Sequence, residues 1–257
     1  MELILGITIP LGPFALALVL LIGVVAGLVK GIVGFAMPMI IISGVSSILS
    51  PELALATLIL PTLVTNGVQA LRQGLSAAMA SVARFRVFLI AGGISLVIAA
   101  QFVRILPQPI LFMVIGVPIV LFAISQLAGK PLRLPAASRR IEVFVGMFAG
   151  FMGGLSGIWG PPTVAYLTAT DTPKADQMRV QGVIYGLGAL ALLLAHVQSG
   201  VLRAETLPLS VLMVVPALIG MAIGSRVQDH IDQVMFRKVT LWVLLIVGFN
   251  LVRRSFF

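Results

Sequence analysis

Long apolar stretches alternate with short polar connections along the whole chain, from about Leu11 to Val252. Many of these stretches approach the roughly 20 residues that an α-helix needs to cross a bilayer. The most polar connection, at residues 129–140, holds two prolines and four basic residues. We therefore predict a first transmembrane repeat at residues 1–128, a cytoplasmic linker at 129–140 and a second transmembrane repeat at 141–257.

An internal repeat supports this division. Residues 23–34 align with residues 146–157 without a gap, and Pro38 then falls opposite Pro161. After one gap, Ser50-Pro51 aligns with Thr172-Pro173, and Ser or Thr followed by Pro is typical of a helix start. Each half is thus expected to begin a new helix at the same point of the repeat.

Both halves contain a Gly/Pro-rich segment at which a helix is expected to break. Fewer than 30 residues separate Glu142 from Thr170, whereas two full spans would need roughly 40. We expect two short helices that meet at a non-helical tip at 153–162, either as a re-entrant hairpin or as a discontinuous helix pair. The equivalent first tip is 30–38. Paired interruptions of this kind mark the binding site in many transporters.

Composition and charge agree with a membrane protein. Of the 257 residues, 60% are hydrophobic and 10% are charged, against roughly a quarter charged in soluble domains. The 17 basic and 8 acidic residues form no basic run long enough for nucleic acid, so we expect no nucleic-acid partner. With no cysteine, disulfides and thiolate metal sites are excluded. The predicted class is an all-α polytopic membrane protein.

The distribution of Lys and Arg predicts the orientation of the two repeats. If each half crosses the membrane an odd number of times, about 12 of the 17 basic residues fall in cytoplasmic loops. An even number of crossings gives a weaker bias. We therefore predict two inverted repeats, each with a broken or re-entrant hairpin followed by about three transmembrane helices.

The residues at the two tips resemble the TauE/SafE family of bacterial sulfite and organosulfonate transport proteins. The second tip reads Gly154-x-Ser156-Gly157-x-x-Gly160-Pro161-Pro162, and the looser first copy reads Gly31-x-x-Gly34-Phe35-x-x-Pro38. Many members carry three glycines at the tip, where this chain has Phe35-Ala36-Met37 and Ile158-Trp159-Gly160. The resemblance implies a multi-pass permease of the bacterial inner (plasma) membrane that moves sulfite, sulfoacetate or other organosulfonates.

Candidate binding groups gather near the tips. Helix starts after Pro38 and Pro161 would present N–H groups that attract anions. Lys30 and Arg179 supply charge, and Asn66 and Gln69 lie one helical turn apart. The predicted substrate-binding residues are Lys30, Gly31, Gly34, Pro38, Asn66, Gln69, Gly154, Ser156, Gly157, Trp159, Gly160, Pro161, Thr163, Arg179 and Tyr185.

Each of these assignments has a structural alternative. The glycines, Gly27 and Gly150 included, could simply allow close helix packing, and buried polar side chains could join helices. Lys30 could extend to an interface, and Arg179 could pair with Asp176. If transport is coupled to protons, Glu52 and Asp176 are the first acids to test.

The sequence favours a secondary transporter, in the direction of export, that works by alternating access around the two tips. The alternatives are an anion channel or a permease for other small organic acids. We expect no enzymatic activity, no cofactor and no metal site. The expected partners are a small anion and the lipid bilayer, with proton coupling and the oligomeric state left open.

Overall fold

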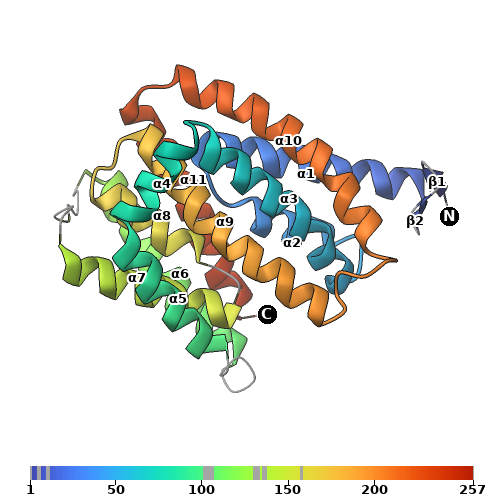
Figure 1. Cartoon of the computed structure of the whole chain (residues 1–257), viewed down its shortest axis with the longest axis horizontal. Helices are drawn as coiled ribbons and strands as arrows, with labels where there is room; N and C mark the ends of the chain where they lie inside the picture. The colour runs from blue at the N-terminus through green and yellow to red at the C-terminus, as the bar shows by residue number, and fades with distance from the viewer. Residues whose placement is uncertain are drawn as a thin grey trace. The chain divides into compact units, whose positions relative to one another are not determined.

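The structure is a computed structural model that describes residues 2–4, 7–9, 12–100, 107–129, 134, 138–156 and 159–256. This part of the chain is almost entirely helical, which confirms the predicted all-α class (Figure 1). At the N-terminus, the three-residue strands β1 (Glu2–Ile4) and β2 (Ile7–Ile9) pair in antiparallel fashion. The helices are α1 (Pro13–Val33), α2 (Met37–Val45), α3 (Pro51–Leu71), α4 (Leu75–Arg84), α5 (Arg86–Ala100), α6 (Gln108–Leu127), α7 (Arg139–Ser156), α8 (Gly160–Ala169), α9 (Lys174–Gln198), α10 (Leu207–His230) and α11 (Gln233–Arg254).

Several helices are long and apolar enough to cross a membrane. Within the described residues, α1, α3, α9, α10 and α11 each qualify alone. Helices α4 and α5 qualify together as a sixth span, although they meet at an angle of 72°. The prediction of a multi-pass transmembrane protein is thereby confirmed.

The two predicted helix breaks are present, and each is shorter than the sequence indicated. The first lies between α1 and α2, where Gly34 has φ 86° and Ala36 has φ 73°. The second lies between α7 and α8. Instead of two short helices, each break joins a long helix to one of nine or ten residues. At 1.5 Å per residue, the short helices cover about half of the hydrocarbon core.

The helices form two compact units. Unit 1 contains Met1–Arg72 and Gly182–Ile231, and unit 2 contains Gln73–Gln181 and Asp232–Phe257. Each unit therefore includes one helix break and takes helices from both predicted repeats. The division into repeats at 1–128 and 141–257, and their inverted orientation, remain sequence-based predictions.

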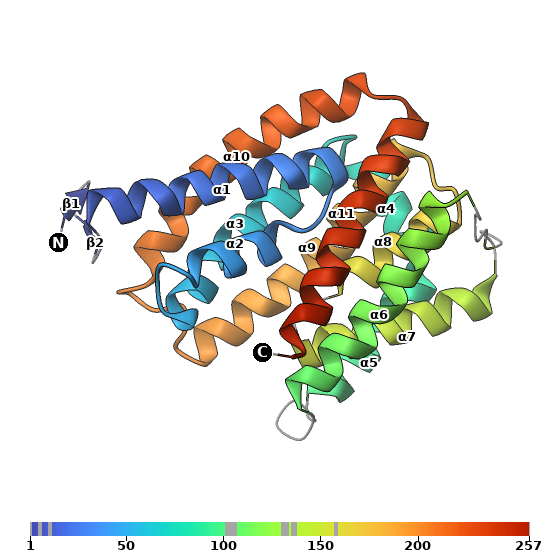
Figure 2. The same cartoon turned by 180° about the vertical axis from the view of Figure 1, so that it is seen from behind.

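In unit 1, α1 packs along α10, and the two helices lie side by side in both views (Figures 1 and 2). The contact is close because Gly27 has no side chain: a Cβ there would lie 2.1 Å from the carbonyl oxygen of Ala217. The core beneath it includes Ala26, Ile41 and Met213, none of which is exposed. The break after α1 is thus held by a helix from the second half of the sequence.

In unit 2, α7 packs along α5 in the same manner (Figure 2). A Cβ at Gly150 would lie 2.0 Å from the carbonyl oxygen of Gly92, and one at Gly146 would lie 2.7 Å from that of Phe88. The contacting residues increase in residue number together along the two helices, so α5 and α7 run in the same direction. Close helix packing, the alternative considered for these glycines, is therefore the role that the geometry assigns to Gly27 and Gly150.

Candidate functional site

Lys30 is the central side chain of a polar cluster at the first helix break. It lies in the last turn of α1, is only 1% exposed, and its Nζ donates a hydrogen bond to Oδ1 of Asn66 on α3. One turn later on α3, Nε2 of Gln69 donates to the carbonyl oxygen of Gly34, at 3.2 Å. The pair of amide side chains predicted to share a face therefore lies against the broken segment.

The position of α3 follows from its ends and its neighbours. Ser50 caps its N-terminus by accepting a hydrogen bond from the backbone N–H of Leu53, at 3.3 Å. Near its other end, a Cβ at Gly182 of α9 would lie 2.4 Å from the backbone nitrogen of Ala70. This close approach brings α9, with the buried Tyr185, to the level of Asn66 and Gln69.

The charge of Lys30 has no carboxylate near it. Among the residues that the structure describes, its hydrogen-bond partner is the neutral side chain of Asn66, and no acidic group lies within ion-pair distance. The acidic side chains that bind an arginine or cap a helix elsewhere are Glu52, Glu142, Asp171, Asp176, Glu205, Asp229 and Asp232. The charged form of Lys30 is costly in this environment, and a bound anion would offset the cost.

The remaining residues of the first break have distinct positions. Gly34 ends α1 in the left-handed conformation, and Pro38 lies in the first turn of α2. N–H groups in the first turn of a helix lack helical acceptors and carry partial positive charge. Gly31 lies against α10, where a Cβ would be 2.4 Å from the carbonyl oxygen of Met221, so it acts in packing.

The second break is built differently. Trp159 is half-buried and lies against α7, where a Cβ at Gly153 would be 2.9 Å from its ring. Thr163 is fully buried, and its hydroxyl donates to the carbonyl oxygen of Trp159 at 2.9 Å. Gly160 and Pro161 form the first turn of α8, and Gly154 remains helical in α7. The side chain of Ser156 and the whole of Gly157 lie outside the described residues.

Arg179 belongs to a polar network inside unit 2. Its guanidinium contacts Asp176 at 2.7 Å and the hydroxyl of Ser81 at 2.7 Å, and it also donates to Oε1 of Gln73. Pairing with Asp176 was the structural alternative for this residue. Substrate binding by Arg179 stays a prediction, and it would require an anion to compete with these contacts.

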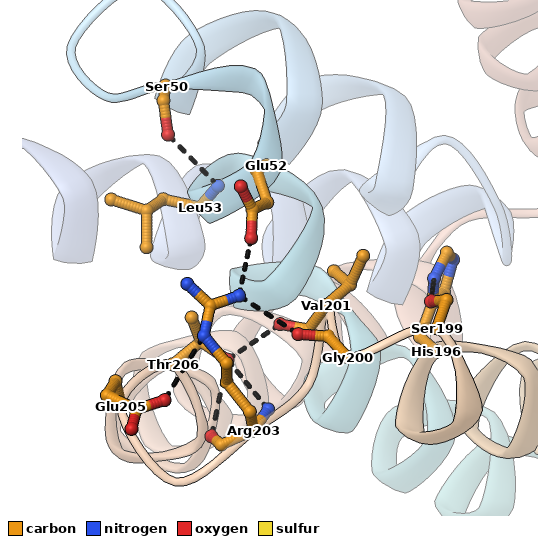
Figure 3. Close-up of polar contacts among 10 residues, drawn as sticks. All are labelled: Ser50, Glu52, Leu53, His196, Ser199, Gly200, Val201, Arg203, Glu205 and Thr206. Atoms are coloured by element: carbon orange, nitrogen blue, oxygen red, sulfur yellow. Dashed lines mark hydrogen bonds and ion pairs between the residues drawn. The ribbon is translucent and has the colours of Figure 1, made fainter.

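Glu52, one of the two acids considered for proton coupling, also forms an ion pair (Figure 3). Its carboxylate lies 2.5 Å from the guanidinium of Arg203, which also contacts Glu205 and the carbonyl oxygen of Gly200. The hydrogen bond to Glu52 is the main reason that the pKa of Arg203 is raised, so this arginine stays charged. These contacts join the start of α3 to the loop before α10.

One polar residue near the cluster at the first helix break was not predicted from the sequence. Thr62 lies one turn before Asn66 on α3 and is 3% exposed. Its hydroxyl is buried and has no hydrogen-bond partner in the part of the chain that the structure describes. The spacing of Thr62, Asn66 and Gln69 at i, i+4 and i+7 was the available signal.

Comparison with known proteins identifies a family. The family profile described as Sulfite exporter TauE/SafE matches residues 19–251, which include both helix breaks and both compact units in large part. No curated protein and no solved structure matches the chain. Most of the residues that carried the resemblance in the sequence lie in the helix turns on either side of the two breaks.

Proposed function

Because the chain belongs to the sulfite exporter TauE/SafE family, we propose that it exports sulfite or a related small sulfur-containing anion, such as a sulfoacetate or another organosulfonate. The family is one of transporters, and the chain has five or six candidate membrane spans. The observation that carries the proposal is the buried Lys30 at the first helix break, with Asn66 as its neutral partner.

The proposed binding site uses donors that lie around this break. The ammonium of Lys30 supplies the full charge, and the hydroxyl of Thr62 and the amide of Asn66 supply neutral donors one turn apart. The first turn of α2 adds backbone N–H groups. Sulfite and sulfonates present three oxygens, so a set of converging donors suits them better than a single cation.

The proposed mechanism is alternating access of this site to the two sides of the membrane. Two short helices that begin at breaks, as α2 and α8 do, are the arrangement found in transporters with discontinuous helices. The proposed location is the bacterial inner (plasma) membrane. We place the segment 129–140 in the cytoplasm, since this orientation puts about 12 of the 17 basic residues inside.

Transport by the purified, reconstituted protein tests the proposal. Proteoliposomes loaded with labelled sulfite, sulfoacetate, taurine or a simple carboxylate should release the sulfur-containing anions faster than protein-free vesicles. Unlabelled substrate on the opposite side should accelerate this release, because a carrier exchanges substrates and a channel does not. Release of the carboxylate alone, or release without this acceleration, would contradict the proposal.

A further inference from the structure

Helix α4 leaves the direction of α5 at a sharp angle. The two helices bend by 72° at Phe85, whereas transmembrane helices tilt by only about 20° from the membrane normal on average. We take α5 as the part of this pair that crosses the bilayer, which places α4 closer to the membrane plane than to its normal. Such a position suits an amphipathic helix at the interface between lipid and water.

The two faces of α4 differ in the way that this position requires. Ala78 and Ser81 are buried, and the hydroxyl of Ser81 accepts a hydrogen bond from Arg179 of the same unit. Leu75 and Met79 lie one turn apart on α4 and are 67% and 57% exposed. An exposed apolar stripe on a helix that lies along the interface is expected to enter the acyl-chain region of the lipid.

The packing of α5 on α7 brings a group of arginines to the same end of unit 2. Arg84 pairs with Glu142, Phe88 lies against Gly146, and Gly92 lies against Gly150. Because the two helices run in the same direction in this register, their first residues are neighbours at one end. Arg86 begins α5, and Arg139 and Arg140 begin α7.

These three arginines carry unneutralised charge. Arg86, Arg139 and Arg140 are exposed, and none of their side chains has a hydrogen bond or an ion pair within the described ranges. Glu142, in the first turn of α7, is bound to Arg84 and is 3% exposed. The end of unit 2 from which α4 emerges therefore has a net positive charge beside an apolar stripe.

We propose that this end of unit 2 binds the headgroups of anionic phospholipids. The phosphates contact Arg86, Arg139 and Arg140, and Leu75 and Met79 insert beside the acyl chains of the same lipids. Lipid is the occupant because cations and an exposed apolar stripe meet here at the end of a membrane-spanning helix. The inference does not depend on the substrate that the protein transports.

Binding of phosphatidylglycerol by the full-length protein tests this proposal. A charge-neutralised pair, Arg139→Gln with Arg140→Gln, is compared with a matched pair, Arg226→Gln with Lys238→Gln. The matched side chains are also exposed and have no partner in the described part of the chain. Retention of the lipid is measured by native mass spectrometry in zwitterionic detergent, and the shift in unfolding temperature on adding phosphatidylglycerol is measured beside it.

The first pair should weaken lipid retention roughly 25-fold, about fivefold for each arginine removed, and should lose most of the temperature shift. The matched pair should retain the lipid as the wild type does. Met79→Gln alone should also weaken lipid retention, although it leaves the charge of the protein unchanged. Equal losses of lipid retention in both pairs would show only a general attraction between charges. Unchanged retention in the first pair would show that Arg139 and Arg140 serve only to orient the chain in the membrane. Either result would overturn the proposal.

Discussion

Lys30 and Ala36 lie at the first helix break, and each has an energetically unfavourable feature. The amine of Lys30 is buried beside a neutral amide, and Ala36 is a non-glycine residue with φ 73°. Costs of this kind persist where surrounding structure enforces them, and they gather at functional sites. The break therefore combines strain in the backbone with an unbalanced charge.

Replacement of Ala36 by glycine should stabilise the protein. The left-handed conformation costs an L-residue about 1 kcal/mol, and glycine adopts it freely, although part of the gain is lost to a more flexible unfolded chain. The expected result is a higher unfolding temperature in detergent. Ala80→Gly, at an exposed position inside α4, should lower that temperature instead. A lower temperature for Ala36→Gly would show that the strain inferred at Ala36 is absent.

The side chains of the site could be predicted in part from their spacing. Asn66 and Gln69 were expected to share a face of one helix, and they do. Their contacts with Lys30 and Gly34 could not be predicted, since these depend on how α3 folds back against the break. The same holds for Arg179, whose partners Ser81 and Gln73 come from a stretch with no recognisable motif.

At the scale of elements, the pairing of helices is decided by glycine-lined faces. Helices α1 and α7 each place glycines four residues apart against a helix of the other predicted repeat. The apolar stretches, the helix starts and the breaks were visible in the sequence because they are local features. The pairing of the helices was not visible, because a glycine at every fourth residue indicates a flat helix face but does not identify the helix that packs against it.

Replacement of Gly150 by alanine should therefore destabilise unit 2. A Cβ there would meet the backbone of Gly92, so the helices must separate, at a cost of about 1–3 kcal/mol. Gly93, next to that contact, faces open space, and Gly93→Ala should leave the unfolding temperature unchanged or raise it. Thermal unfolding of both variants in the same detergent is the measurement. Equal temperatures would contradict the close packing of α5 and α7.

At the scale of the whole molecule, the chain is a multi-pass membrane protein of a transporter family. Its two compact units each contain one helix break, and each draws helices from both halves of the sequence. Class, family and breaks followed from hydropathy and from the Gly/Pro pattern. The composition of the units did not, because long-range helix contacts leave no signal in a single sequence.

In the proposed transport mechanism, the ammonium group of Lys30 binds the transported anion. Binding of sulfite to the purified protein, measured by calorimetry for wild type, Lys30→Met and Lys238→Met, tests it most directly. Lys238 is exposed on α11 and serves as the matched control. Lys30→Met should remain folded, because it removes a buried charge that has no acidic partner.

Wild type and Lys238→Met should bind sulfite with equal affinity. Lys30→Met should bind it about 10- to 100-fold more weakly, which corresponds to the loss of one charge-assisted hydrogen bond. Sulfite binding by a folded Lys30→Met protein with the affinity of the wild type would contradict the proposed role of Lys30.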